Sequence, residues 1–285
     1  MKYLIVKGWL GFGDRLESLK MCVFYAQKHN LQIYVDWRDP MWSHGSEDFY
    51  TYFNLLMPTF KLEDIPEDAT YYPPYWKGHL DEQITYDFLN AHVNDNLKLD
   101  MIDKPFDADV VVYACNGSRA LYPDSVFFAN VFRVVDPRIL NKVRQHSQSY
   151  PLQNSWGIHI RGTDRVRVDR RMRSVQSIVN MLTNLGGMNK EHMVVVSDDK
   201  ENAQIMKNYY SRAYIVSNFA SDSIKGIHNL SKDELGISKD QLNVDMLIDF
   251  FVLAKCQRVF TTIKDSRFAR EAERLHPVVN NILGF

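Results

Sequence analysis

The sequence predicts an α/β protein built on parallel sheets. Short apolar runs typical of buried strands alternate along the chain with longer segments whose apolar residues recur at helical spacing. This alternation favours strand–helix–strand units and therefore parallel pairing. Two of the strands, at 3–6 and 157–160, run directly into loops of glycine and charged residues. In open α/β sheets, ligands bind at the carboxyl ends of strands, so these two loops are the places to look for function.

The first half begins with a strand, a glycine loop and a helix. The elements expected there are strand 3–6, loop 8–13, helix 14–29, and strands 32–37 and 109–115. Between the last two strands lies a segment rich in Tyr, Trp and Pro, including 71–76, which is poor material for a helix or strand. Its aromatic side chains are expected to pack within an ordered loop, and a stacking wall for a sugar is the alternative.

A polar, proline-bearing segment at 147–155 is the best candidate for a linker. It follows a helix that Pro137 opens at its first position. After it, the expected strands are 157–160, 193–197, 213–216 and 258–262, and the expected helices are 174–185, 200–209, 242–256 and 266–276. We therefore predict two Rossmann-like domains, residues 1–150 and 151–285, with a ligand-binding cleft between them.

Composition excludes several classes of protein. With 45% hydrophobic and 24% charged residues, the chain is typical of a soluble globular protein. A net charge of −1 gives no strong field for nucleic acid, so no nucleic-acid partner is expected. No apolar run approaches the roughly 20 residues of a transmembrane helix, and the first strand is too short for a signal peptide. Cys22, Cys115 and Cys256 lie far apart in apolar segments, which predicts buried free thiols and a reducing, cytoplasmic setting.

The most informative motif is the strand that ends at Ile160 and the residues after it. Arg161, Gly162, Thr163, Asp164 and Arg165 follow the strand directly, and six arginines lie between positions 161 and 173. A guanidinium beside a glycine suits a phosphate or pyrophosphate. The alternatives are a strand with a charged turn and a solvated basic loop.

The N-terminal glycine loop resembles a dinucleotide-binding loop in part. Gly8, Gly11 and Gly13 are spaced G-x-x-G-x-G rather than G-x-G-x-x-G, and Asp36 is the nearest candidate for a ribose-binding acid. Backbone N–H groups at the start of the following helix suit an anion, with Asp14 and Arg15 projecting toward the ligand. Packing in a tight turn explains the glycines equally well.

Acidic residues recur at three later positions. Asp198 and Asp199 end an apolar strand, where they can cap the next helix, bind a base or ribose, or bind a metal, although no third acidic ligand is evident. Asp245 and Asp249 share one face of an apolar helix, so at least one needs a partner: an arginine of the same domain or the Watson–Crick edge of guanine. Ser266 is placed to cap the last long helix or to hold a phosphate there.

In this order, the motifs resemble those of the fucosyltransferase superfamily with the GT-B fold. Its members include α-1,6-fucosyltransferases, rhizobial nodulation fucosyltransferases and protein O-fucosyltransferases. The resemblance rests on the glycine loop, on the pattern His159-x-Arg161-x-x-Asp164, on Ser197-Asp198-Asp199, and on the acidic helix with its following serine turn. It covers roughly residues 155 to 275 and, in the first half, the glycine loop alone. The α-1,6 type has a second arginine where this chain has Gly162, which leaves the sugar open.

The resemblance implies roles for individual residues. Arg161 would bind the β-phosphate of a sugar nucleotide and stabilise the leaving diphosphate, and Asp249 would read guanine. The expected catalytic residues are Arg161, from the resemblance, and Asp14, as a candidate base. The expected donor-binding residues are Gly11, Gly13, His159, Arg161, Thr163, Asp164, Asp198, Asp199, Asp249, Ser266 and Arg267. No metal and no cofactor are expected, because an arginine supplies the positive charge.

The function expected is that of an inverting glycosyltransferase that moves fucose from GDP-fucose to a glycan acceptor without a metal. Asp14, Asp39 and His44 are candidates for the base that takes the acceptor proton. The alternatives are a glycosyltransferase for another nucleotide sugar, an NAD-dependent oxidoreductase, and a nucleotide-sugar-binding module without catalysis. The acceptor, its linkage and the oligomeric state stay open.

Overall fold

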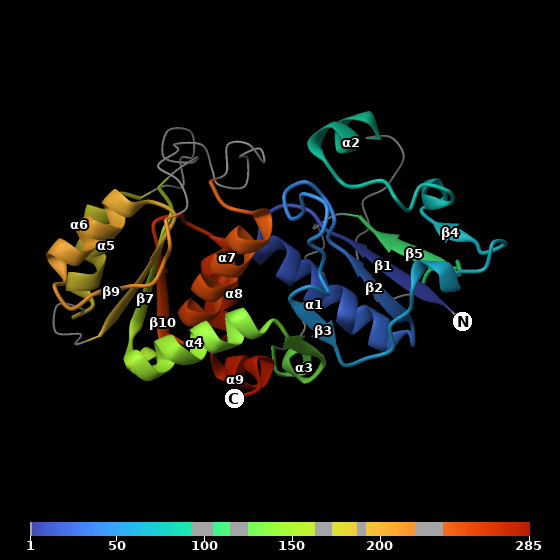
Figure 1. Cartoon of the computed structure of the whole chain (residues 1–285). Helices are drawn as coiled ribbons and strands as arrows, with labels where there is room; N and C mark the ends of the chain where they lie inside the picture. The colour runs from blue at the N-terminus through green and yellow to red at the C-terminus, as the bar shows by residue number, and fades with distance from the viewer. Residues whose placement is uncertain (1, 93–104, 115–124, 163–172, 187–191, 220–235) are drawn as a thin grey trace. The chain divides into compact units, whose positions relative to one another are not determined.

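The computed structural model describes residues 2–92, 105–114, 125–162, 173–186, 192–219 and 236–285. These residues form two compact units: Met1–Val135 with Asn280–Phe285, and Asp136–Val279 (Figure 1). Each unit contains a four-stranded sheet in which every pair of neighbours is parallel. The predicted α/β class is therefore confirmed. Among the described residues, no helix is both long and apolar enough to cross a membrane.

The sheet of the first unit has the strand order β2-β1-β5-β4. Its strands are β1 (Tyr3–Lys7), β2 (Gln32–Asp36), β4 (Tyr71–Tyr72) and β5 (Val110–Tyr113). Helix α1 (Phe12–Lys28) connects β1 to β2 and packs against both strands. Because β1 and β2 pair in register, their last residues, Lys7 and Asp36, lie side by side at the carboxyl edge of the sheet.

The aromatic segment differs from its prediction. Tyr71 and Tyr72 form an edge strand on β5, and Pro74–Trp76 form a short 3₁₀-helix. Trp76 is fully buried in the core that covers the sheet face of Ile5 and Val112. The expected lack of strand was wrong because a two-residue strand leaves no alternation to detect, whereas the expected packing of aromatic side chains is confirmed.

Smaller elements complete the first unit. They are β3 (Phe53–Leu55), β6 (Phe132–Val134), α2 (Tyr86–Ala91), α3 (Ser125–Val131), the 3₁₀-helix Leu62–Asp64, and part of α9 (Val279–Leu283). Strands β3 and β6 pair antiparallel and were not predicted. They bring Phe53 and Phe132 into ring contact, with centroids 4.9 Å apart, within a largely aromatic cluster.

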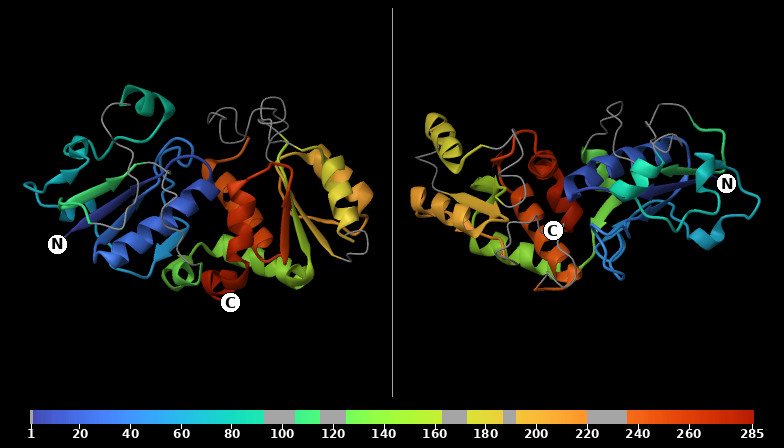
Figure 2. Two further views of the ribbon diagram at one scale, coloured as in Figure 1. Left: turned by 180° about the vertical axis from the view of Figure 1, so that it is seen from behind. Right: turned by 90° about the horizontal axis from the view of Figure 1, so that it is seen from above.

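The sheet of the second unit has the order β10-β7-β8-β9, with helices on both faces (Figure 2). Its elements are β7 (Trp156–Ile160), α5 (Val175–Asn184), β8 (Met193–Ser197), α6 (Lys200–Tyr209), β9 (Tyr214–Ile215), α7 (Lys239–Ala254), β10 (Arg258–Thr261), α8 (Arg267–Leu275) and the 3₁₀-helix His276–Val278. Ile158 and Ile160 pack with α5 and α6. Gly157 faces α7 so closely that an added Cβ would lie 2.6 Å from Leu253 Cδ1.

The division between the units falls after Val135, not at the predicted boundary after residue 150. Helix α4 (Pro137–Ser149) belongs to the second unit because it buries Ile139 and Val143 and packs on α7. Arg138 reinforces this packing by bonding Asp240, in the first turn of α7. The segment predicted as a linker is ordered structure: Tyr150 stacks on Tyr214 at 4.8 Å, and a 3₁₀-helix, Leu152–Asn154, leads into β7.

The cysteines agree with their prediction where the structure describes them. Cys22 and Cys256 are buried free thiols, and burial raises the pKa of both. Cys115 lies outside the described residues.

Candidate functional site

Arg161 lies directly after β7, at the carboxyl edge of the second sheet, and Asp198 holds it there. The Arg161 Nε atom is 3.1 Å from Asp198 Oδ2, and the side chains are 19% and 12% exposed. The backbone N–H of Gly162 donates to the other carboxylate oxygen, Oδ1, at 2.7 Å. Asp198 therefore fixes both the guanidinium and the backbone after it. The predicted capping role falls to the next residue instead.

Thr262 fixes the backbone of Arg161 from the neighbouring strand. Its buried hydroxyl accepts the Arg161 N–H at 2.9 Å, and its own N–H donates to the His159 carbonyl at 3.1 Å. The ends of β7 and β10 are thus joined by two hydrogen bonds. The sequence analysis did not identify Thr262; the available signal was a pair of threonines at the end of the predicted strand 258–262.

His159 points to the face of the sheet opposite Ile158 and Ile160. Its ring stacks on Phe268, with centroids 5.0 Å apart, and Nδ1 is 3.2 Å from Thr261 Oγ1. Burial, with the charge of Arg161 adding to it, lowers the pKa of His159 to about 3. The imidazole is neutral at physiological pH, so it can exchange a hydrogen bond with a ligand but brings no positive charge to a phosphate.

Asp199 caps α6, as one of its predicted alternatives. Its Oδ1 accepts from Asn202 N at 2.9 Å and its Oδ2 from Asn202 Nδ2 at 2.8 Å. Its side chain also occupies the space beside Gly162, where an added Cβ would lie 2.1 Å from Asp199 Oδ2. This close approach gives a physical reason for glycine at the position where the α-1,6 type has an arginine.

Asp249 lies on α7, and its partner is a hydroxyl rather than an arginine. Ser217 Oγ donates to Asp249 Oδ2 at 2.5 Å and accepts from Ser197 N at 2.8 Å. Burial raises the pKa of Asp249 to about 8; the Ser217 bond opposes the rise, and the charges of Asp245 and Asp198 add to it. Ser217 was also missed, because its segment carries no motif.

Asp245, one turn before Asp249, is bonded separately. It accepts from Gln241 Nε2 at 2.9 Å and from Asn218 Nδ2 at 3.3 Å. The two carboxyls that share a helix face therefore have different hydrogen-bond partners.

Ser266 caps α8, accepting from Ala269 N at 3.3 Å. Arg267 is the first residue of this helix and is partly exposed. The predicted site residues Thr163 and Asp164 lie outside the described residues, as do Arg165 and the arginines at 167, 170 and 171. In the second unit, the structure thus brings together Arg161, Asp198, His159 and Thr262 at the ends of adjacent strands.

The glycine loop of the first unit leads into α1 as predicted. Gly11 is the N-cap residue without a side-chain cap, and its carbonyl accepts from Asp14 N at 3.0 Å and Arg15 N at 3.1 Å. Asp14 is partly exposed in the first turn, while Gly13 is buried. The N-cap residue of this 17-residue helix makes no side-chain capping bond, and the N–H groups at a helix start suit an anion.

Arg15 does not project toward a ligand as predicted. Its Nη1 and Nη2 atoms each lie 2.7 Å from one oxygen of Asp39, and both side chains are almost fully buried. Because both Asp39 oxygens accept from this guanidinium, Asp39 is removed as a candidate base. Asp14 and His44 remain.

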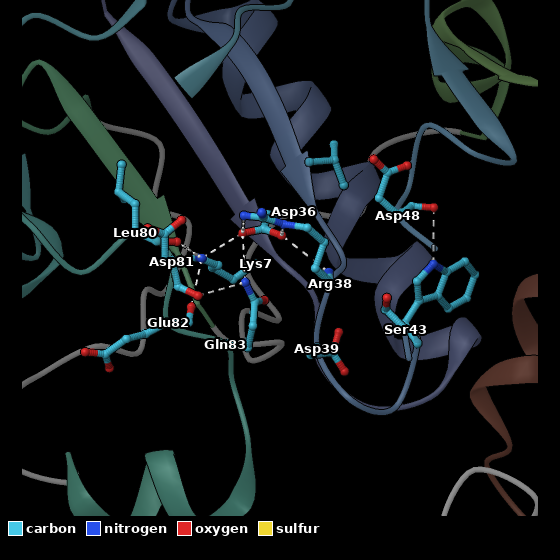
Figure 3. A network of polar contacts seen from close by, with 12 residues as sticks. Lys7, Asp36, Arg38, Asp39, Ser43, Asp48, Leu80, Asp81, Glu82 and Gln83 are labelled. Carbon is cyan, nitrogen blue, oxygen red and sulfur yellow. Dashed lines mark hydrogen bonds and ion pairs between the residues drawn. The ribbon is translucent and has the colours of Figure 1, made fainter. Parts of the chain in front are cut away.

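Asp36, the predicted ribose-binding acid, is also engaged (Figure 3). It accepts from Lys7 Nζ at 2.7 Å and from Arg38 Nε at 2.8 Å. Burial acts to raise the pKa of Asp36, but Arg38 and Lys7 outweigh it and hold the value at about 2. Lys7 also donates to the carbonyls of Leu80 and Glu82, so this cluster ties a loop to the sheet edge.

No group of three or more His, Cys, Asp or Glu side chains that could hold a metal ion occurs among the described residues.

No protein-family model and no curated protein matches the sequence. Solved structures do match. Fucosyltransferase NodZ from Bradyrhizobium superimposes with a TM-score of 0.69 at 14% identity, over 95% of this chain and 92% of that one. An Arabidopsis thaliana FUT1 mutant in complex with GDP gives 0.56 at 13%, over 96% and 68%. POFUT1 in complex with GDP gives 0.53 at 11%, over 99% and 96%.

Structures of NodZ α-1,6-fucosyltransferase soaked with GDP-fucose and co-crystallised with GDP give TM-scores of 0.69 and 0.70. At such identities the likeness is one of fold. The chain therefore has the α/β GT-B fold of the fucosyltransferases, as the order of its motifs predicts.

Proposed function

We propose that the protein is an inverting glycosyltransferase that transfers fucose from GDP-fucose to a glycan acceptor without a metal. The observation that carries the proposal is Arg161, held at the carboxyl end of β7 by Asp198 and Thr262. This is the place in an α/β sheet where a nucleotide diphosphate binds. The fold shared with fucosyltransferases studied with GDP and GDP-fucose supports the same donor.

The proposed reaction is a displacement at the anomeric carbon of the donor sugar. The acceptor oxygen forms a bond to that carbon on one face while the bond to the β-phosphate oxygen breaks on the other. Negative charge develops on the departing diphosphate, where the Arg161 guanidinium stabilises it. The acceptor proton passes to a base, for which Asp14 and His44 are the remaining candidates.

Asp249 is proposed to read guanine. A carboxylate accepts the N1–H and N2–H₂ donors of the base, whereas a protonated carboxyl does so less well. With a pKa of about 8, Asp249 carries a proton at neutral pH in the free protein. Binding of GDP is then accompanied by release of this proton, and the affinity for GDP rises as the pH approaches 8.

The remaining assignments belong to the same proposal. Gly11 and Gly13 are proposed to offer backbone N–H groups to the diphosphate. The other proposed donor-binding residues are His159, Thr163, Asp164, Asp198, Asp199, Ser266 and Arg267. We also infer that the enzyme works in the cytoplasm.

Two alternative functions differ in their support. The hypothesis of an NAD-dependent oxidoreductase loses its candidate ribose-binding acid, because Asp36 is bonded to Lys7 and Arg38. A nucleotide-sugar-binding module without catalysis needs the same donor residues, so turnover decides between it and the enzyme.

Calorimetric titration with GDP and UDP, without added metal, tests the proposal. Wild type should prefer GDP, and Arg161→Ala should weaken GDP binding about 10- to 100-fold, since a hydrogen bond to a charged group contributes about 1.5–3 kcal/mol. Arg138→Ala is the matched control, because that guanidinium is bonded to Asp136 and Asp240 instead. Preference for UDP would remove the guanine role of Asp249, and binding of neither nucleotide would overturn the proposal.

Turnover is then measured as release of GDP from GDP-fucose in the presence of a panel of oligosaccharides. Transfer of fucose to an oligosaccharide would establish that the protein is a glycosyltransferase. Tight GDP-fucose binding without turnover of any acceptor would favour the binding module.

A further inference from the structure

The buried Arg15–Asp39 ion pair contacts the glycine loop of the first unit. Arg15 uses its two terminal nitrogens on Asp39, and its Nε donates to the carbonyl of Leu10 at 2.8 Å. Leu10 has a φ of +65°, a conformation that residues with a side chain seldom adopt. Such a conformation persists only where its surroundings enforce it, and the Arg15 bond is one contact that does so.

The same pair also contacts the start of the loop. A Cβ added to Gly8 would lie 2.1 Å from Arg15 Nη1 and 2.9 Å from Asp39 Oδ2. The backbone of Gly8 is therefore packed against the ion pair, and only a residue without a side chain fits. Gly8 and Leu10 thus both contact the Arg15 guanidinium, while the Gly8 N–H donates to the Asp36 carbonyl at 2.7 Å.

The guanidinium is immobilised on its remaining sides. The Arg15 Cζ atom lies 5.5 Å from the ring centre of Trp37 and 5.3 Å from that of Trp42. Asp39 is fixed in turn, because its Oδ1 accepts from Met41 N at 3.2 Å. A buried ion pair is seldom a better source of stability than apolar side chains of similar size, so this arrangement favours a role in geometry.

We propose that Arg15 and Asp39 are positioning residues, which hold the loop at 8–13 so that the backbone N–H groups at its end, where α1 begins, meet an anionic group of the ligand. The inference rests on the proposed function, under which that group is the diphosphate of the nucleotide sugar. Neither side chain touches the ligand: they are 1% and 0% exposed. They act through Gly8, Leu10 and the start of α1.

The chain offers a matched control three positions away. Asp36 has the same fully buried carboxylate as Asp39 and, like it, is bonded to an arginine. Its partners, however, are Lys7 and Arg38, and Lys7 reaches Leu80 and Glu82 rather than Leu10 (Figure 3). Asp36→Asn therefore perturbs an equally buried cluster that does not hold Leu10.

The experiment compares Asp39→Asn, Arg15→Lys and Asp36→Asn with the wild type. Amide hydrogen exchange is read at Asp14 and at position 15, whose N–H groups donate to the Gly11 carbonyl, and at Leu4 and Ile5 in β1 as a reference. We expect the Asp39→Asn and Arg15→Lys variants to lose protection at 14 and 15 about tenfold more than at 4 and 5. GDP binding by calorimetry should weaken about tenfold in both variants. In Asp36→Asn, the loss of protection at 14 and 15 relative to 4 and 5 should stay within about twofold, and so should the affinity for GDP.

The outcomes separate the two proposals. Equal loss of protection at both places, or equal loss of GDP affinity in Asp36→Asn, would show a general structural role and overturn the positioning role. Unchanged protection and affinity in Asp39→Asn and Arg15→Lys would also overturn it. If wild type binds no GDP, the proposed function fails, while the exchange data still decide whether the pair holds the loop. Arg15→Lys keeps the positive charge, so it serves where Asp39→Asn does not fold.

Discussion

The carboxyl edges of the two parallel sheets occupy equivalent places in their units but treat charge in opposite ways. At the first edge, Lys7, Asp36, Arg15 and Asp39 are buried, and each is bonded to a group of opposite charge. At the second edge, Arg161 and Asp198 are partly exposed, Asp249 has a hydroxyl partner, and His159 is neutral. The charged groups of the first edge are buried in ion pairs, whereas the Arg161–Asp198 pair of the second edge is partly exposed.

The difference shows that charged residues after a strand do not by themselves locate a ligand. Charged residues that are paired and buried hold loops in place. Charged residues that are partly exposed, or whose pKa is shifted by burial, are available to a bound molecule.

The largest effect is expected from breaking the closed edge. Asp39→Asn leaves Arg15 buried without a counter-charge and should lower the free energy of unfolding by about 3–5 kcal/mol. Asp198→Asn, at the open edge, should cost about 1 kcal/mol, because solvent screens the Arg161 pair. Denaturant unfolding of both variants measures the difference, and equal losses would end the contrast between the edges.

The next effect concerns the proton on Asp249. With a folded pKa of about 8 against an ordinary value of 3.8, the folded protein holds one more proton than the unfolded chain between these values. Stability contributed by this group is complete below pH 4 and is lost as the pH rises toward 8. Asp249→Asn should therefore gain stability relative to wild type between pH 5 and 9, on the order of 1–3 kcal/mol.

Asp245→Asn tests the cause of that shift. Because burial is its main cause and the charge of Asp245 a lesser one, this variant should keep most of the wild-type pH dependence. A flat stability profile in Asp245→Asn would mean that charge repulsion, not burial, sets the pKa of Asp249.

His159 is expected to change the stability with pH in the opposite direction to Asp249. Its folded pKa of about 3 lies below the ordinary 6.5, so the unfolded chain binds a proton that the folded protein does not. Stability contributed by the neutral ring is present above pH 6.5 and is lost as the pH falls below it. Relative to wild type, His159→Gln should gain about 1–2 kcal/mol between pH 7 and pH 5, measured by thermal or denaturant unfolding across that range.

The smallest effect is expected at Gly162. A Cβ there displaces the Asp199 side chain, and loss of the α6 cap costs about 1 kcal/mol. The Gly162→Ala and Asp199→Ala changes should therefore cost less together than the sum of the two alone. Strict additivity, measured by unfolding of the three variants, would show that the cap survives in Gly162→Ala.

Local patterns predicted the regular elements of both units. Strand β8 and helix α6 have the predicted bounds, because a continuous apolar run and a capped amphipathic helix each carry their own signal. The three-residue strands β3 and β6 do not, since they are too short for alternation to be seen. The boundary after Val135 was missed because α4 is placed by contacts with α7, which lies a hundred residues later.

The site was predictable only in part for the same reason. The sequence predicts Arg161 and Asp198 at the ends of two strands, but it does not predict the hydrogen bonds of Thr262 or Ser217, whose partners lie far along the chain. Arg15 and Asp39 were each read as site residues, because nothing in the sequence shows that two residues 24 apart neutralise each other. Pairing of this kind depends on tertiary structure. A charged residue that is paired inside the protein holds the backbone in place and is not available to contact a ligand.

The return of residues 280–285 to the first unit makes the second unit an insertion within it. The polypeptide passes between the two units twice, after Val135 and before Asn280. A fragment that stops at the first crossing lacks part of its own unit, whereas residues 136–279 are contiguous. Genetic exchange of the second unit between relatives would therefore need two junctions, and the first unit would be restored only when both were joined in frame.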